Sequence, residues 1–169
     1  MITDGNEIII TEASREDAEG IAALERVCFP ENEAEEAASI ERRLEAVPGC
    51  FLLALAPGTG EIIGYICGIP TNEERFRDEF FTQPELYERD GRNVIMLSVD
   101  VSPEFRGRGV ARRLISAFAE RAKAEGRERL LLTCHTALIG YYESMGFALV
   151  GPAGSHWGGG IWNEMKREL

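Results

Sequence analysis

The part of the sequence that decides the fold is residues 94–122, VIMLSVDVSPEFRGRGVARRLISAFAERA. Its first eight residues are mostly apolar and β-branched, which predicts a strand that ends at Ser102 and Pro103. After Gly109 the apolar residues follow helical spacing as far as Gly126, namely Val110, Leu114, Ile115, Phe118 and Ala122. A strand, a glycine-rich turn and an amphipathic helix therefore follow one another.

The turn between this strand and this helix is suited to an anion. Free backbone N–H groups and the helix dipole meet there, and glycines let a ligand approach the backbone. Four arginines and no acid lie within eight residues, at Arg106, Arg108, Arg112 and Arg113. The turn lacks the glycine spacing of dinucleotide folds and the Gly-Lys-Ser/Thr of a P-loop. We therefore expect a small ligand with several phosphates, and an exposed helix start is the alternative.

Outward from this stretch, the chain alternates between strand and helix patterns. A strand at 7–11 leads through Ser14 and Asp17, a helix-starting pair, into a helix ending near Phe29. The expected inward positions of that helix are Ala18, Ile21, Ala22, Leu24, Val27 and Cys28. The later elements are a helix at 33–47, a hairpin of 51–56 and 61–69, a short helix with a long loop in 71–93, a strand at 129–135, a helix at 136–145, and strands at 147–151 and 161–166.

This order, β-α-α-β-β-(α)-β-α-β-α-β-β, predicts an α/β fold. Because strand-helix-strand units need crossovers, we expect a mixed sheet with helices on both faces. The length of 169 residues, without repeats or linkers, predicts one domain over residues 1–169.

Composition limits the class of protein. With 44% hydrophobic and 28% charged residues, the chain has the content of a soluble globular protein. No apolar run approaches the ~20 residues of a membrane span and no basic flank marks a signal peptide, so we expect a cytoplasmic protein without a membrane partner. Four cysteines without a C-x-x-C pair predict buried free thiols and no metal site, and they are Cys28, Cys50, Cys67 and Cys134.

The charge is uneven. Residues 1–93 carry 21 acidic and 8 basic side chains, and residues 94–169 carry 8 acidic and 10 basic ones. An acidic chain repels nucleic-acid phosphates, so no nucleic-acid partner is expected. The simplest interpretation of the acidic half is solvated helix faces, while the arginine-bearing half suits a phosphorylated ligand.

Two motifs carry a resemblance to a known family. Residues 101–111, VSPEFRGRGVA, resemble the acetyl-CoA loop of the GNAT superfamily of N-acetyltransferases, and residues 142–147, YESMGF, resemble its Tyr-x-x-x-Gly-Phe segment. The resemblance implies a GNAT-like, mostly antiparallel sheet, acetyl-CoA as co-substrate, and direct transfer of the acetyl group to a primary amine in a ternary complex.

Within that superfamily the chain resembles the arylalkylamine (serotonin) N-acetyltransferase branch and its bacterial relatives. The matching segments are residues 25–30, 132–138, 151–152 and 163–165. The two histidines of the animal enzymes are replaced by Ile95 and Leu97. Removal of the amine proton then falls to His135, to a carboxylate acting through water, or to bulk solvent.

The resemblance also implies a set of cofactor-binding residues. Val99 or Val101 would offer a backbone N–H to the thioester oxygen, for which ordinary ladder hydrogen bonding is the alternative. The implied acetyl-CoA contacts are Val99, Val101, Arg106, Gly107, Arg108, Gly109, Val110 and Ala111.

The implied catalytic residues are Tyr142 and His135. Tyr142 would protonate the departing thiolate, although helical periodicity alone would equally allow Tyr141 to be the core residue. His135 would act as acid/base or substrate contact, the alternative being a structural histidine. Adjacent Cys134 should face the other side of the strand, which disfavours a covalent acetyl-cysteine. The candidate acceptor contacts are Phe29, His156 and Trp157, whereas Phe76, Phe80, Phe81 and Tyr87 are expected mainly in the core.

The sequence thus predicts an acetyl-CoA-dependent N-acetyltransferase, monomeric or homodimeric, for an arylalkylamine or another small cationic amine. The acidic half of the chain would draw such a cation. The alternatives are a protein N-terminal or lysine acetyltransferase and a non-catalytic acyl-CoA sensor.

Overall fold

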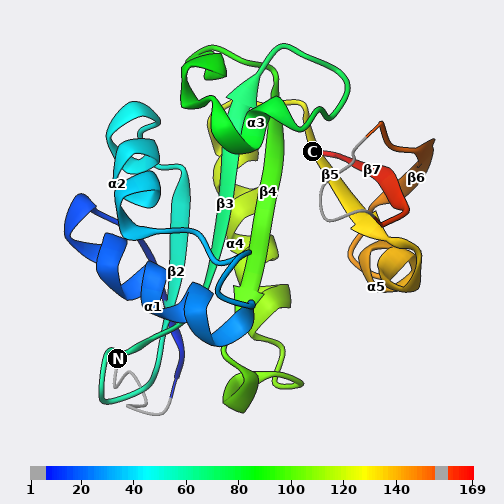
Figure 1. Ribbon diagram of the computed structural model, residues 1–169. Helices are drawn as coiled ribbons and strands as arrows, with labels where there is room; N and C mark the ends of the chain where they lie inside the picture. The colour runs from blue at the N-terminus through cyan, green and yellow to red at the C-terminus, as the bar shows by residue number, and fades with distance from the viewer. Residues whose placement is uncertain (1–6, 155–159) are drawn as a thin grey trace. The chain divides into compact units, whose positions relative to one another are not determined.

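The computed structural model describes residues 7–154 and 160–169 (Figure 1). The strands are β1 (Ile9–Glu12), β2 (Phe51–Leu55), β3 (Ile62–Thr71), β4 (Asn93–Val101), β5 (Arg129–His135), β6 (Ala148–Pro152) and β7 (Trp162–Glu168). The helices are α1 (Ala18–Cys28), α2 (Ala37–Ala46), α3 (Glu79–Thr82), α4 (Val110–Ala124) and α5 (Ile139–Glu143). The predicted order of strands and helices is confirmed.

The strands form one seven-stranded sheet with the order β1-β2-β3-β4-β5-β7-β6. The pairs β1–β2, β2–β3, β5–β7 and β6–β7 are antiparallel, and β4–β5 is parallel. A parallel neighbour requires a crossover connection, which α4 supplies. The predicted mixed, mostly antiparallel α/β fold is therefore confirmed.

The chain forms two compact units. The first comprises the residues up to Cys67 together with Ser98–Phe118, and the second comprises Gly68–Leu97 and Ala119–Leu169. Strands β3 and β4 and helix α4 each contribute residues to both units. The single domain over 1–169 stays a prediction.

In the first unit, helices cover both faces of the sheet. A Cβ built at Gly64 of β3 would lie 3.3 Å from a Leu114 methyl group of α4. The next residue, Tyr65, donates its hydroxyl to the Glu25 carboxylate of α1. Because successive strand residues point to opposite faces, α1 and α4 lie on opposite sides of β3.

Helix α1 begins where the sequence predicts. The face that it buries differs from the predicted one. The Ser14 amide donates to Asp17 Oδ2 at 2.8 Å, which is the expected capping arrangement. Val27, predicted to face inward, is 62% exposed, and Cys28 is only partly buried. At about 100° per residue, Val27 lies about 180° around the helix from buried Ala18, whereas Glu25 lies inside the buried stripe.

In the second unit, the segment between β3 and β4 folds back onto the end of β3. Glu88 donates its amide to the Pro70 carbonyl at 3.0 Å. Buried Glu164 of β7 accepts hydrogen bonds from the Phe76 amide at 2.8 Å and from Arg75 Nε at 2.7 Å. These bonds hold the polar segment against β7.

All four cysteines are free thiols, as predicted, and Cys50, Cys67 and Cys134 are buried. Cys28 departs from the expectation of burial, because it lies at the C-terminal end of α1, where the helix gives way to the extended backbone of Phe29. None of the described helices has the length and apolar character that crossing a membrane requires.

A substitution at Gly91 tests the fold-back of the 72–92 segment. A Cβ there would lie 2.7 Å from the Thr71 Cα and closer still to its amide nitrogen, both rigid backbone atoms. Gly91→Ala should therefore lower the free energy of unfolding by about 1–3 kcal/mol in urea titrations. Gly140→Ala, at a helical glycine with open space around it, is the control and should change stability by less than about 1 kcal/mol, in the stabilising direction. Equal stability of the two variants would contradict the close approach.

Candidate functional site

The glycine turn of the first unit connects β4 to α4. Its two glycines have positive φ angles, 74° at Gly107 and 78° at Gly109, which residues with a side chain adopt only at a cost. The Gly109 carbonyl accepts the first helical hydrogen bond, from the Arg113 amide at 3.0 Å. The amides of the first turn of α4 thus lack helical acceptors, and apart from the adjacent residues no described atom lies within 4 Å of a Cβ built at either glycine. The backbone of this turn is open to a ligand.

The arginines of the turn differ in what they contact. Arg106 Nε donates to the Val101 carbonyl at 3.0 Å, which ties the turn to the end of β4. The Arg108 guanidinium lies 5.2 Å from the centre of the Phe105 ring. Arg113 donates to the Ile8 carbonyl at 3.0 Å and lies 3.6 Å from Glu7. The expectation of four arginines on one ligand therefore needs correction, because Arg113 is directed toward β1.

Beside the turn, three side chains of the first unit form an acidic cluster, which we define as Glu25, Tyr65 and Asp100, and of these Asp100 is only partly buried. They come from α1, β3 and β4, and the Tyr65 hydroxyl donates to Glu25 Oε1. Glu25 and Tyr65 are only 5% and 1% exposed. Asp100 Oδ2 is fully enclosed and accepts no hydrogen bond from the residues that the structure describes.

Burial shifts the acidities within this cluster. It raises the pKa of Glu25, opposed by the hydrogen bonds from Tyr65 and the Glu35 amide. It raises the pKa of Asp100 to about 6, opposed by Tyr65 and Arg106 and assisted by the charge of Glu25. Burial and the two carboxylates raise the pKa of Tyr65 well above its ordinary value, so its hydroxyl remains a donor.

Sequence reasoning missed the acidic cluster. Two signals were available: Asp100 is the only charged residue in β4, and Glu25 follows Ile21 by four residues on the buried side of α1. No pattern in the sequence indicates that Tyr65 joins them, because that contact depends on how β3 pairs and how α1 packs.

The candidate acid Tyr142 lies in the second unit, near the end of α5. Its ring packs edge-on against Phe147 at 5.8 Å, and its carbonyl accepts from the Met145 and Phe147 amides at 3.0 and 3.2 Å. Gly146, with φ of 88°, permits this reversal. Tyr142 is partly buried, whereas Tyr141 is 39% exposed. The Tyr-x-x-x-Gly-Phe segment is therefore a compact turn around the carbonyl of Tyr142.

The candidate His135 ends β5 in the second unit. It is exposed and stacks on Trp162 of β7, with ring centres 4.1 Å apart. Cys134 is buried, with its Sγ 3.6 Å from Met165 Sδ, so the two neighbours face opposite sides as expected. The Sγ and the imidazole thus form no Cys–His pair.

Strand β5 continues beyond its parallel partner. Within the second unit the described β4–β5 pairs end at Ile95↔Leu131, and β5 runs on to His135 paired with β7. Along one edge, the last residues of β5 consequently have no pairing partner among the described residues of that unit.

The candidate acceptor contacts are only partly described. Phe29 is partly buried, immediately after α1, and His156 and Trp157 lie outside the described residues. Of the aromatic residues expected in the core, Phe76 and Phe80 are buried, whereas Phe81 and Tyr87 are partly exposed.

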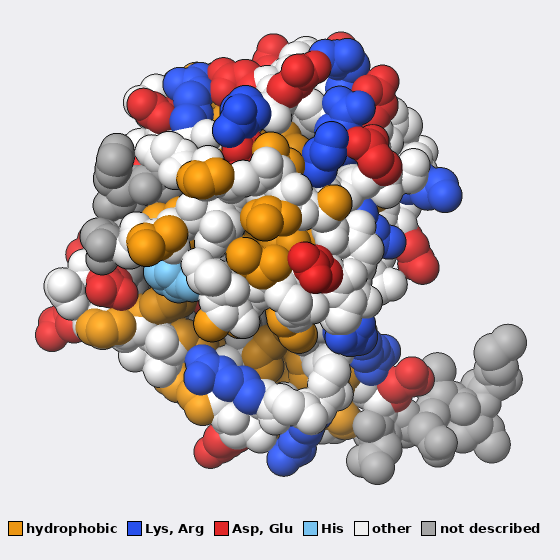
Figure 2. All heavy atoms as spheres, turned by 90° about the vertical axis from the view of Figure 1, so that its right-hand side faces the viewer, with side chains coloured by type: hydrophobic (Ala, Val, Ile, Leu, Met, Phe, Trp, Pro, Cys, Tyr) orange, Lys and Arg blue, Asp and Glu red, His pale blue; other side chains and the backbone are white. Residues whose placement is uncertain are grey.

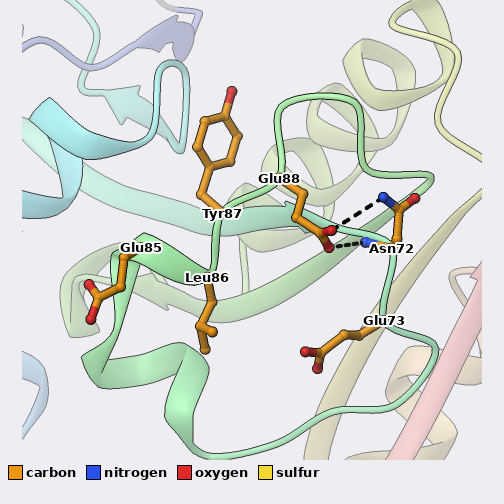
Figure 3. Close-up of a pocket in the computed structure, with 6 residues that line it drawn as sticks. All are labelled: Asn72, Glu73, Glu85, Leu86, Tyr87 and Glu88. Carbon is orange, nitrogen blue, oxygen red and sulfur yellow. Dashed lines mark hydrogen bonds between the residues drawn. The ribbon is translucent and has the colours of Figure 1, made fainter.

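A pocket of about 470 Å³ opens in the second unit, in the segment before β4 (Figure 3). Two of its three acids hold the chain: Glu88 accepts from the Asn72 amide at 2.6 Å, which lowers the pKa of Glu88, and Glu73 pairs with Arg77 at 2.5 Å. These contacts make the pocket a consequence of the fold-back of this segment.

One face of the second unit carries scattered apolar side chains, seen among charged ones in Figure 2. Among the described residues of this unit, the exposed large hydrophobic ones are Leu138, Tyr141, Leu149, Val150 and Ile161. Among residues 7–154 and 160–169, no group of three His, Cys, Asp or Glu side chains could hold a metal ion.

Comparison with known proteins gives a family. Residues 18–147 match the model of the acetyltransferase (GNAT) family. An acetyltransferase of Pectobacterium atrosepticum is 31% identical over 114 residues, which is 66% of this chain and 66% of that protein. The match thus spans just under two thirds of the relative's length.

Solved structures share the fold at low identity. The loading GNATL domain of CurA from Lyngbya majuscula superposes with a TM-score of 0.81 at 16% identity, covering 96% of this chain and 98% of that one. The GNAT-like decarboxylase GphF, in complex with isobutyryl-CoA, has the same TM-score and identity over 95% and 98%. Ard1 from Thermoplasma volcanium has a TM-score of 0.74 at 20% identity over 96% and 97%.

The shifted acidity of Asp100 predicts how stability depends on pH. The Asp100 carboxyl group stays protonated up to about pH 6 in the folded state, whereas the ordinary pKa of an aspartate side chain is 3.8. Between these values the unfolded state binds fewer protons, so stability falls as pH rises. The whole difference amounts to at most about 3 kcal/mol. Asp100→Asn, which cannot ionise, should therefore gain stability over the wild type by about 1–3 kcal/mol as pH rises from 4 to 7.

Urea titrations across this range measure the effect, and exposed Asp90→Asn is the control. A difference between Asp100→Asn and wild type that stays constant from pH 4 to 7 would contradict the shifted acidity.

Proposed function

Because the chain belongs to the GNAT acetyltransferase family, we propose that it transfers an acetyl group from acetyl-CoA to a primary amine. The observation that carries the proposal is the open glycine turn at the start of α4, in which both glycines have positive φ and no atom crowds the backbone. The GNAT fold binds acyl-CoA, and the similar GphF structure contains isobutyryl-CoA. Four free thiols support a reducing compartment, the cytoplasm.

The turn binds the pyrophosphate of acetyl-CoA in this proposal. Backbone amides at residues 107–111 donate to the phosphate oxygens, and the dipole of the 15-residue helix α4 adds favourable charge. Arg108, exposed beside Phe105, supplies a positive charge, while Arg106 holds the turn against β4. A backbone N–H of Val99 or Val101 stabilises the oxygen of the thioester as it gains charge.

Tyr142 protonates the leaving thiolate. A phenol with a pKa of ~10 gives a proton to a thiolate whose thiol has a pKa of ~8.5. The transfer is uphill by the difference of about 1.5 in pKa, so the step contributes modestly. The packing of Tyr142 against Phe147 supports this role, because it limits the ring to few orientations. Loss of the hydroxyl slows the reaction and does not abolish it.

The acceptor is a small cationic amine, of which an arylalkylamine is the first candidate. Phe29, His156 and Trp157 contact its apolar part, and His135 lies in an aromatic setting, stacked on Trp162, that suits a substrate contact. The acidic character of residues 1–93 attracts the ammonium group.

A panel of amines decides the class of acceptor. Purified protein, acetyl-CoA and each amine are mixed and free CoA thiol is measured, using tryptamine, benzylamine, spermidine, glucosamine and a lysine peptide. Thiol release that depends on an arylalkylamine supports the proposal. Release with the peptide alone favours a protein acetyltransferase, and binding of acetyl-CoA without any release favours a sensor.

The glycine turn gives a binding prediction. Gly109→Val should weaken acetyl-CoA binding at least tenfold, about 1.4 kcal/mol, because the side chain both strains the positive φ and crowds the ligand. Isothermal calorimetry measures the affinity. Gly58→Val is a matched control, since Gly58 has the same φ of 78° and open surroundings in the β2–β3 turn. It should lose stability and keep its affinity, and an unchanged affinity in folded Gly109→Val would remove the turn from the site.

The role of Tyr142 predicts a kinetic effect. Tyr142→Phe should lower kcat by roughly 10- to 1000-fold and leave the affinity for acetyl-CoA nearly unchanged, because the hydroxyl acts on the leaving group. Tyr141→Phe, the exposed neighbour, is the control and should retain kcat. Wild-type kcat in Tyr142→Phe, where chemistry limits turnover, would refute the assignment.

A further inference from the structure

Arg43 lies on the buried side of α2. Its exposed fraction is 5%, and among the described residues it is the only basic one that is buried. The buried residues of α2 are Ile40 and Arg43, three apart on one helix face, whereas the adjacent Arg42 is exposed. A charged group loses its hydration when it is buried, and an apolar side chain at this position would avoid that loss. The burial of Arg43 therefore needs an explanation beyond solubility or packing.

The Arg43 guanidinium holds Glu35, near the end of the connection between α1 and α2. Its Nη2 donates to Glu35 Oε1 at 2.6 Å and its Nη1 donates to Oε2 at 3.1 Å, so one planar group binds both carboxylate oxygens. Ser39 Oγ also donates to Glu35 Oε1, at 2.9 Å. The Glu35 amide donates to Glu25 Oε2 of α1 at 3.2 Å. Glu35 is thus joined to α1 by its backbone and to α2 by its side chain.

The connection itself, residues 29–36, is held at both ends. Phe29 begins it, and the Phe29 amide donates to the Glu25 carbonyl at 2.9 Å. The Glu33 amide donates to the Pro30 carbonyl at 2.9 Å, which closes one turn between the ends. Because only a few residues separate the two ends, release of the far end also changes the conformations open to the near end. The position of Phe29, the proposed acceptor contact, therefore depends on the anchor at the far end.

The same guanidinium lies against the sheet. Its central carbon is 5.9 Å from the centre of the Phe51 ring in β2, and its Nη1 is 3.9 Å from Cys67 Sγ in β3. Cys50 Sγ donates to the Arg43 carbonyl at 3.6 Å, which ties the backbone of α2 to the start of β2. Arg43 consequently contacts both the sheet and the connection, so it sets where the connection lies on the sheet. A lysine side chain, with one nitrogen, holds a carboxylate at a single point.

We propose that Arg43 is a positioning residue for the acceptor amine: through Glu35 it fixes residues 29–36 and hence the place of Phe29. This inference rests on the proposed function, in which Phe29 contacts the acceptor. Arg43 itself touches neither acetyl-CoA nor the acceptor in this assignment, so it acts on acceptor binding and leaves the chemical step unchanged. A connection that is fixed before the acceptor arrives loses less conformational entropy on binding, and this raises the affinity.

Arg43→Lys tests the assignment, because lysine keeps the positive charge and loses the bidentate pair. With the best amine of the panel, KM for the amine should rise about tenfold, while kcat and the affinity for acetyl-CoA stay within about threefold of wild type. Loss of an interaction that binds the ground state and the transition state equally has this signature. Exposed Arg15 pairs with Glu41 and Glu45 of the same helix, so Arg15→Lys is the control and should leave KM at the wild-type value.

Amide hydrogen exchange supplies a readout that needs no activity. In wild type the Glu35 amide is bonded to Glu25, and in Arg43→Lys it should exchange about tenfold faster, because the connection opens more often. The amides of Ile21 and Ala22, buried in α1, report on the rest of the first unit and should keep their rates. Equal loss of protection at all three amides would make Arg43 a stabilising residue only and would contradict the positioning role.

A double variant separates the anchor from simple packing. Arg43→Met combined with Glu35→Met replaces the ion pair by apolar side chains, a change that often preserves stability. KM for the amine should stay raised by about tenfold, because methionine side chains are flexible and fix no single geometry. A return of KM to the wild-type value would assign the pair to packing and overturn the inference.

Two further results would overturn it. An unchanged KM in Arg43→Lys would remove Arg43 from acceptor binding, and a fall in kcat or in acetyl-CoA affinity as large as the change in KM would make its effect a general one. In each of these cases acetyl transfer itself stands. If wild type binds acetyl-CoA and acetylates no amine of the panel, the proposed function falls and the role of Arg43 in acceptor binding falls with it, whatever the exchange rates show.

Discussion

The parallel pairing of β4 with β5 is the constraint on which the functional arrangement depends. Parallel neighbours cannot be joined by a tight turn, so the chain must cross over through α4. The crossover puts a helix N-terminus directly after the end of β4, and the two positive-φ glycines make the connection short and open. The parallel ladder then ends after Ile95, while β5 continues to His135. An open helix N-terminus follows from this one pairing, as does the edge of β5 that lacks a pairing partner among the described residues of the second unit.

Stability and chemistry oppose each other in the first unit. Helix α1 buries Ala18, Ile21 and Ala22 completely or nearly so, and it buries Glu25 in the same stripe. A carboxyl group in that position lowers stability above its own pKa, because the charged form loses its hydration. The hydroxyl of Tyr65 and the amide of Glu35 offset part of this cost. The first unit thus keeps a carboxyl group inside the buried stripe of α1 at a cost to its stability.

The sequence predicted the order of the elements, the parallel crossover and the glycine turn because those features are local. Alternation, helical spacing, capping residues and glycine positions act over a few residues, and β5 (Arg129–His135) has the bounds expected for it. It also indicated the family through two motifs, which the match over residues 18–147 confirms. The prediction for Val27 was wrong, because an apolar residue at the edge of a helical stripe gives no sign of which side the sheet covers.

What the sequence alone determined is therefore the fold class, the family and the turn that suits a phosphate. Only the tertiary structure decided which charged residues act together. It turned Arg113 toward Ile8 and away from the set of arginines expected on the ligand, and it joined Glu25 to Tyr65 across 40 positions of the chain. The physical reason is that a helix or strand follows from neighbours in sequence, whereas the Glu25–Tyr65 hydrogen bond requires α1 and β3 to bring two side chains together, which only packing sets.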